Sequence, residues 1–152
     1  MGVGHVPQKP IRPASASAQF QGSQHRRTSA DRSVSAAARI ARGKWAEDLT
    51  TRWYEHHGYQ IIARNWRCPR GELDVVALLG DELVVCEVKA RASVAFGTPA
   101  EAVTSNKQLR VRRATAALLA ELRANKSRNI RHVRFDVACV LGSQLEIVMD
   151  AF

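Results

Sequence analysis

The stretch GELDVVALLGDELVVCEVKA, residues 71–90, decides the fold. It contains two apolar runs of strand length, 72–79 and 82–90, separated by Gly80 and Asp81, a pair that favours a tight turn. We therefore predict a β-hairpin. Each run also carries charged residues, and burying an unpaired charge is costly. The direction in which these charged side chains point therefore determines what the hairpin can do.

The charged side chains of the predicted hairpin fall on one face. For an even loop centred on the turn, paired residue numbers sum to 161, so Asp74 lies opposite Glu87 and Glu72 lies opposite Lys89. Toward the turn, the same face carries Val76, Leu78, Leu83 and Val85. The other face is wholly apolar and is expected to pack on a helix; it carries Leu73, Val75, Ala77, Val84, Cys86 and Val88. An odd loop or a bulge would shift this register.

Two opposed carboxylates repel each other and need a compensating positive charge. A divalent cation would supply it, because Mg²⁺ takes one or two carboxylates and keeps several waters. Lys89 would then face the same metal-bound water and could stabilise charge on a phosphate. The alternative is that Glu72 pairs with Lys89, and Asp74 with an arginine, on a solvated face. The spacing alone leaves both interpretations open.

The rest of the chain predicts two helices and three further strands. Apolar periodicity indicates helices over 35–57 and 105–123. Strand patterns cover 60–65, 133–141 and 145–149, and 91–104 forms a loop. The order is α-β-β-β-α-β-β, which favours an α/β fold with a central mixed sheet and a helix on at least one face.

Several other residues have two possible roles. Core positions are predicted for Trp45, Trp53 and Phe135. Trp66, which lies beside two arginines, either packs at the rim of the core or stacks on an unpaired base. Asp136 is expected to pair with Arg134 or to cap local structure, without a catalytic role. The helix residue Glu47, taken alone, is an ordinary solvated charge.

The positive charge of the chain is unevenly distributed. The net charge is +9, but residues 1–42 carry seven basic side chains against the single acidic Asp31. Residues 1–36 are rich in Ser, Ala and Arg and are predicted to be a disordered tail, followed by one domain over 37–152. A transit peptide or a start codon placed too early would also explain this tail. Residues 105–134 carry nine basic side chains and one acidic one, the electrostatic footprint of an anionic partner.

The cysteines and the hydropathy indicate the compartment. The three cysteines are isolated and never in C-x-x-C spacing, which argues against a zinc site and against a disulfide framework. This usage suggests a reducing, cytoplasmic environment. No apolar run approaches the ~20 residues of a membrane span, so we expect no membrane partner.

Together these motifs resemble the PD-(D/E)XK nuclease superfamily. The resemblance rests on Asp74 in one strand, Glu87-Val88-Lys89 as E-x-K in the next, and a preceding helix with Glu47. More narrowly, over about residues 40–152, the chain resembles the YraN-like family of uncharacterised bacterial proteins, related to archaeal Holliday junction resolvases. The matching pieces are Gly58, A-R-N-W-R at 63–67, G-E-L-D at 71–74, V-C-E-V-K-A-R at 85–91, F-G-T-P at 96–99, E-A-V at 101–103 with Lys107, and R-F-D at 134–136. The chain departs from the pattern at Leu73, where the superfamily has proline, and at Ala46, where glycine is frequent.

The resemblance implies a restriction-endonuclease-like αβββαβ core, with a central mixed sheet flanked by helices. It implies catalytic roles for Asp74, Glu87 and Lys89, and a Mg²⁺ or Mn²⁺ cofactor held by Asp74 and Glu87 with Glu47 as an extra ligand. Near this site, contacts to nucleic acid are expected from Arg67, Arg91, Lys107 and Arg110.

Two functions are compatible with this site. The first is a metal-dependent DNA endonuclease that hydrolyses phosphodiester bonds in branched or otherwise structured DNA, as in DNA repair or recombination. One domain has room for one such site, so cutting both strands of a junction would need a homodimer. The second is a non-catalytic nucleic-acid-binding or scaffolding module that retains the nuclease fold.

Overall fold

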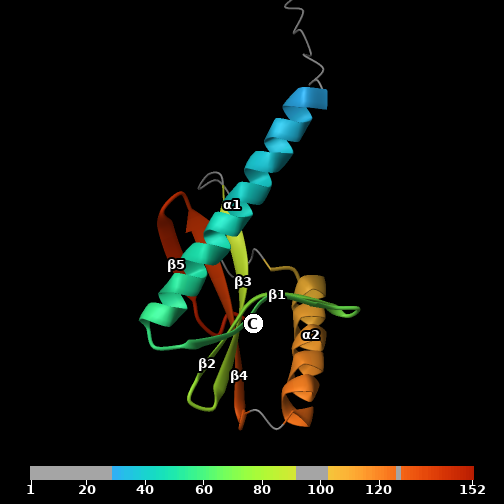
Figure 1. Cartoon of the computed structure of the whole chain (residues 1–152), viewed down its shortest axis with the longest axis vertical. Coiled ribbons are helices and arrows are strands. Elements are labelled where there is room, and N and C mark those ends of the chain that lie inside the picture. Colours follow the sequence, from blue (N-terminus) through green and yellow to red (C-terminus); the bar gives the residue numbers. More distant parts are fainter. Residues whose placement is uncertain (1–28, 92–102, 126–127) are drawn as a thin grey trace, which may run out of the picture.

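The computed structural model describes residues 29–91, 103–125 and 128–152 (Figure 1). Within these ranges every predicted helix and strand is present, in the predicted order. The elements are α1 Ser29–His56, β1 Gln60–Cys68, β2 Gly71–Leu79, β3 Glu82–Arg91, α2 Ser105–Ala124, β4 His132–Leu141 and β5 Gln144–Val148.

The first helix is longer than the sequence pattern indicated. It begins at Ser29, so residues 29–36, which we assigned to the disordered tail, are helical. The rest of the predicted tail, residues 1–28, and most of the predicted loop over 91–104 lie outside the described residues. Among the described helices, none is long and apolar enough to cross a membrane.

The five strands form one mixed sheet in the order β1-β2-β3-β4-β5. Strands β3 and β4 are parallel, and the other neighbours are antiparallel. The chain therefore crosses over from β3 to β4 through α2, as a parallel pair requires. This is the predicted α/β arrangement with a central mixed sheet.

The hairpin of β2 and β3 has the predicted register. Leu79 pairs with Glu82 across a two-residue loop, and the pairing continues to Val75 and Cys86. Gly80 has a φ of 61°, as the first loop residue of a type II′ turn requires, and glycine adopts this conformation without strain. The turn chemistry and the alternation of the strands together determine which side chains share a face.

The two faces of the sheet are covered by different helices. Leu83 and Val85 pack with Val111 and Leu118 of α2. Their neighbours in β3, Val84 and Cys86, point to the opposite face and pack with Tyr54 of α1. The predicted apolar face thus packs on α1, while the apolar half of the charged face is buried under α2.

Leu73 is an exception to the predicted alternation. We placed it on the same face as Val75, but it packs on the α2 side with its strand partner, Trp66. The register of β1 with β2 shifts once, between Ile61 and Ala63, and is the same at Arg64–Val75 and at Trp66–Leu73. Between these last two pairs, Asn65 stands opposite Asp74 and has a φ of 48°, outside the strand conformation. The strict alternation of side chains is therefore interrupted at this point, and Leu73 lies on the face opposite to Val75.

Helix α1 is seated on the sheet by three residues at four-residue spacing, Ala46, Thr50 and Tyr54, each fully buried. The Thr50 hydroxyl is satisfied by donating to the carbonyl of Ala46 at 2.8 Å. The prediction of Trp45 as a core residue is wrong, because its side chain is 46% exposed, and Ile40 is 71% exposed. The buried positions of α1 include an alanine and two threonines, Thr50 and Thr51, which the spacing of large apolar residues does not mark.

The other aromatic predictions agree with the structure. Phe135 is buried beneath α2, and Trp66 packs against the same cluster, as the packing alternative required. Trp53 is partly buried and packs on the α1 side.

Asp136 is fully buried beneath α1 and serves a structural role. Its carboxylate accepts hydrogen bonds from the Tyr54 hydroxyl at 2.7 Å, from Arg134 Nε at 2.9 Å and from the Asp150 N–H at 3.0 Å. Arg134 also pairs with Glu82 at 2.6 Å. The predicted pairing of Asp136 with Arg134 is confirmed, and the network ties α1, β3, β4 and the C-terminal segment together.

Candidate metal and nucleic-acid site

The candidate site lies where β2 and β3 separate. Their pairing ends at Val75 and Cys86, one step before Asp74 and Glu87 would face each other. Beyond this point a side chain, and not the backbone of β2, binds the backbone of β3: Asp74 Oδ2 accepts a hydrogen bond from the Val88 N–H at 2.8 Å. This bond fixes the Asp74 carboxylate against β3, beside Glu87.

Glu87 is the most deeply buried acidic side chain of the site, at 3% exposure. Its Oε1 lies 2.8 Å from the Nζ of Lys89 and 3.0 Å from the Nζ of Lys107. Lys107 belongs to the first turn of α2, whose N-cap is Thr104. A buried carboxylate needs such partners, because an unpaired charge in this position would be strongly destabilising.

Lys107 therefore has a different place from the one we predicted. We expected it among the residues that contact nucleic acid, and the structure brings it into the carboxylate cluster. Basic residues at a helix N-terminus oppose the helix dipole, so its position there is unfavourable for the helix alone. The ion pair with Glu87 accounts for it.

Glu72 does not belong to this cluster in the way the register suggested. We paired it with Lys89, but its carboxylate lies 3.4 Å from Arg67 Nε, across the β1–β2 pair. The reason is that β2 is paired with β3 only as far as Val75, whereas its start remains paired with β1 and places Glu72 opposite Arg67.

The pKa of Asp74 is perturbed by its surroundings. Burial of the carboxyl, together with the negative charge of Glu87, raises this pKa to about 6. The Val88 N–H and the charge of Lys107 oppose this rise. The raised pKa means that the surroundings of Asp74 disfavour its ionised form. A bound cation would relieve this, which is the property expected of a cation-binding site.

Glu47 approaches the site from α1. Its charge contributes to the raised pKa of Asp74, and its Oε2 accepts a hydrogen bond from Asn65 Nδ2 at 2.7 Å. Beside it, Asp48 pairs with Arg64, which lowers the pKa of that carboxyl. The irregular residue Asn65 thus connects Glu47 to the strands. Sequence reasoning did not single out Asn65, although it lies within the A-R-N-W-R motif.

The donor set fits a hard divalent cation with two protein carboxylates. In the part of the chain that the structure describes, no three His, Cys, Asp or Glu side chains are grouped closely enough to hold a metal by themselves. Asp74 and Glu87 form a pair, and Glu47 is engaged by Asn65. Mg²⁺ suits such a site, because it is commonly bound through one or two carboxylates and completes its shell with water or phosphate oxygens.

The predicted nucleic-acid contacts do not form a single patch. Arg67 and Arg110 line one shallow cavity of about 260 Å³ beside the β1–β2 turn. In this cavity Gly71 lets α2 approach closely, because a Cβ at this position would lie 3.1 Å from the Arg110 carbonyl oxygen. Arg91 lies elsewhere, in a larger cavity at the end of β3.

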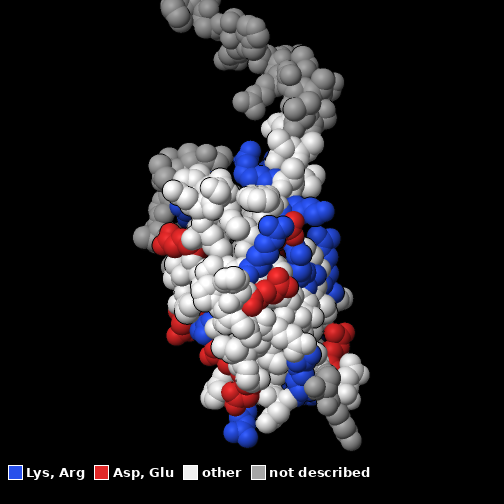
Figure 2. All heavy atoms as spheres, turned by 60° about the vertical axis from the view of Figure 1, so that its left-hand side comes forward, with Lys and Arg blue, Asp and Glu red and all other residues white. Residues whose placement is uncertain are grey.

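Helix α1 carries basic residues that sequence reasoning left unassigned. Arg39, Arg42 and Lys44 are exposed, and residues 35–46 contain no acidic side chain. Figure 2 shows Lys and Arg atoms gathered around the region below the projecting end of α1, and mixed signs of charge lower on the same face. The sequence contained a signal for this basic surface, because every charged residue between positions 35 and 46 is basic.

The fold and the site define an α/β protein with a restriction-endonuclease-like core, in which two carboxylates and a lysine meet where the internal strands β2 and β3 of a mixed sheet separate. Residues 46–140 match the model of a family described as "Uncharacterised protein family UPF0102". The chain belongs to this family, in agreement with the YraN-like resemblance of its motifs.

Similar proteins named UPF0102 protein occur in several bacteria. One from Beutenbergia cavernae is 50% identical over 107 residues, covering 70% of this chain and 87% of the relative. One from Acidothermus cellulolyticus is 43% identical over 128 residues, covering 77% and 97%. One from Rhodococcus opacus is 44% identical over 121 residues, covering 76% and 99%.

Proposed function

We propose that this protein is a metal-dependent endonuclease that hydrolyses phosphodiester bonds in DNA. The observation that carries the proposal is the convergence of three groups where β2 and β3 separate. The Asp74 carboxylate is held by the Val88 N–H, and the buried Glu87 carboxylate lies beside it, 2.8 Å from Lys89 Nζ. A carboxylate pair with an adjacent ammonium group supports hydrolysis of a phosphate ester better than it supports a purely structural role, because the pair destabilises itself.

In this proposal Asp74 and Glu87 hold Mg²⁺ or Mn²⁺. Such an ion, when bound, polarises a phosphoryl oxygen and makes a bound water more acidic. The chain's own residues do the positioning. The Val88 N–H fixes the orientation of Asp74, and burial beneath α2 fixes Glu87. The Nζ of Lys89 donates a hydrogen bond to Glu87 and therefore lies beside the carboxylate pair. From there it would orient the attacking water or stabilise the charge that develops on the phosphate.

The substrate proposed is DNA with branched or otherwise structured regions. The exposed basic residues Arg39, Arg42 and Lys44 of α1, with Arg67 and Arg110 beside the β1–β2 turn, offer contacts to phosphates on more than one side of the site. A homodimer would supply the second site needed to cut two strands of a junction.

One observation favours a second candidate, a non-catalytic nucleic-acid-binding module. Both Lys89 and Lys107 contact Glu87 Oε1, so this carboxylate is compensated without a metal ion. A protein that had lost hydrolysis could keep this ion cluster for stability alone. The two candidates differ in whether Asp74 has a role in chemistry.

The test is a cleavage assay with junction, flap and linear DNA in the presence of Mg²⁺ or Mn²⁺. We expect cleavage by the native protein, its loss with chelator, and its loss in the variants Asp74→Asn and Lys89→Ala. Arg52→Ala, an exposed change on α1, serves as the control that keeps activity. Cleavage that both site variants retain would contradict the site assignment. Absence of cleavage, with salt-sensitive DNA binding that survives Asp74→Asn, would favour the non-catalytic module.

A further inference from the structure

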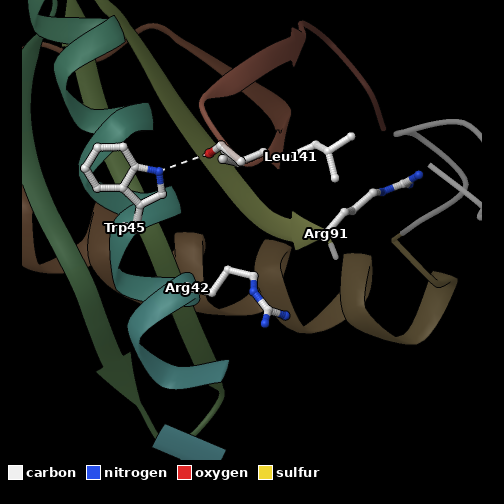
Figure 3. Close-up of a pocket in the computed structure, with 6 residues that line it drawn as sticks. Arg42, Trp45, Arg91 and Leu141 are labelled. Carbon is white, nitrogen blue, oxygen red and sulfur yellow. Dashed lines mark hydrogen bonds between the residues drawn. The ribbon is translucent and has the colours of Figure 1, made fainter. Parts of the chain in front are cut away.

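A second cavity lies between α1 and the far ends of β3 and β4, apart from the carboxylate pair (Figure 3). Its volume is about 780 Å³, within the range of small-molecule sites. Figure 3 shows that Trp45 and Arg42 approach it from α1, while Arg91 and Leu141 approach it from the strand ends. The lining residues are Arg42, Trp45, Arg91, Val140, Leu141 and Gly142.

Trp45 is exposed but held in one orientation. Its side chain is 46% exposed, and its Nε1 donates a hydrogen bond to the carbonyl oxygen of Gly142 at 3.0 Å. The bond crosses from α1 to the β4–β5 turn, so it restricts rotation of the indole. The N–H of this indole is hydrogen-bonded while its ring remains accessible, so the ring can stack on an aromatic ligand.

The charged residues that line the cavity are two arginines. Arg42 is exposed on α1, and Arg91 is the last residue of β3. None of the six described lining residues is acidic. A ligand that fits must therefore combine an aromatic or apolar body with negative charge, which is the chemistry of a nucleotide.

We propose that this cavity binds an unpaired nucleotide of single-stranded nucleic acid, with its base against Trp45 and its phosphates near Arg42 and Arg91. The proposal rests on the proposed function, since it assigns a place to a single-stranded part of the same substrate. A stable protein partner would need a surface of about 800 Å² or more on this side. The cavity instead offers a compact site with two guanidinium groups.

The position of the cavity suits an extension of the candidate active site. Glu87 and Arg91 lie four residues apart on β3, which corresponds to about 13 Å along a strand. Phosphates in one strand of a duplex are spaced by about 3.4 Å along the axis. Arg91, at the cavity, therefore lies within a few nucleotides of the carboxylate pair. It would favour substrates that are single-stranded a few nucleotides from the scissile bond.

The experiment measures binding without chemistry. A fluorescein-labelled oligothymidylate of about 12 nucleotides, a length within the usual site size of single-strand binding folds, is titrated with the full chain in EDTA. A blunt duplex of the same length is the comparison. Fluorescence anisotropy gives the affinity, and repeating the titration at several salt concentrations gives the number of phosphate contacts.

The variants separate stacking from charge. Trp45→Ala is expected to weaken binding of the single strand by about tenfold or more, whereas Trp45→Phe retains most of the affinity because a ring remains. Arg42→Ala is expected to lower both the affinity and the steepness of its salt dependence. Arg52→Ala removes the same charge ten residues away on α1 and should change neither quantity. Circular dichroism checks that each variant is folded.

Two results would overturn the proposal. One is an affinity for oligothymidylate that is the same in the native protein, Trp45→Ala and Arg42→Ala. The other is a loss of self-association in Trp45→Ala with no change in oligonucleotide binding, which would make the cavity an interface between copies of the chain. Either result leaves cleavage by the carboxylate site untouched. Conversely, absence of cleavage with intact Trp45-dependent binding would refute the proposed function alone.

Discussion

The carboxylate of Asp74 is expected to destabilise the metal-free protein, so Asp74→Asn should increase its stability. Burial and the neighbouring charge of Glu87 raise the pKa of Asp74 from an ordinary 3.8 to about 6. At neutral pH the folded protein must therefore hold an ionised carboxyl that it would prefer to keep protonated. Asparagine has no charge, and its carbonyl oxygen can still accept the hydrogen bond from the Val88 N–H.

The magnitude follows from the shift in pKa. A rise from 3.8 to about 6 corresponds to about 3 kcal/mol, so the expected gain is about 2 to 3 kcal/mol. The sign depends on pH. The protonated Asp74 contributes stability that is fully present below pH 3.8 and is lost as the pH rises through about 6. The advantage of Asp74→Asn is therefore largest at neutral pH and disappears in acid.

The assay is thermal unfolding followed by circular dichroism in EDTA, between pH 4 and pH 8. A gain of about 2 kcal/mol corresponds to a midpoint higher by roughly 5–10 °C at pH 7.5. Addition of Mg²⁺ should raise the midpoint of the native protein and leave Asp74→Asn almost unchanged. A variant that is less stable than the native protein at pH 7.5, or an advantage that persists unchanged at pH 4, would refute the electrostatic reasoning.

Three further predictions test the surroundings of the site. Lys107→Met should destabilise the metal-free protein by about 1–3 kcal/mol, because Glu87 loses a partner, and Mg²⁺ should restore part of the loss in thermal unfolding. Tyr54→Phe should cost about 1–3 kcal/mol in urea unfolding, since the buried Asp136 loses a hydrogen bond of 2.7 Å; an unchanged midpoint would show that the carboxylate does not need it. Gly71→Ala should cost about 1–2 kcal/mol, because the new methyl group would meet the backbone of α2 at 3.1 Å, and an equally stable variant would mean that α2 can shift.

The sequence predicted the hairpin and the residues of the site. Gly80 provides the conformation that a two-residue turn requires, and the alternation of apolar side chains admits one register, so Asp74 and Glu87 were expected at one end of one face. These features are local in the chain. They follow from turn chemistry and from the two-residue period of a strand, which holds from Val75 to Leu79 and from Glu82 to Cys86.

The surroundings of these residues were decided only by the tertiary structure. Glu72 pairs with Arg67 and not with Lys89, because the pairing of β2 with β3 ends at Val75 and Cys86, whereas Glu72 stands opposite Arg67 in β1. The core prediction for Trp45 was wrong because α1 packs on the sheet through Ala46, Thr50 and Tyr54. The spacing of the large apolar residues does not mark this face.

The ion pair of Lys107 was also not predictable from the sequence. It lies 20 residues after Glu87 in the chain, and only the packing of α2 across the sheet brings its Nζ to 3.0 Å from that carboxylate. The sequence by itself determined which charged groups lie on the hairpin. The tertiary structure decided which partners hold them, because ion pairs between distant segments depend on how helices and irregular strands pack.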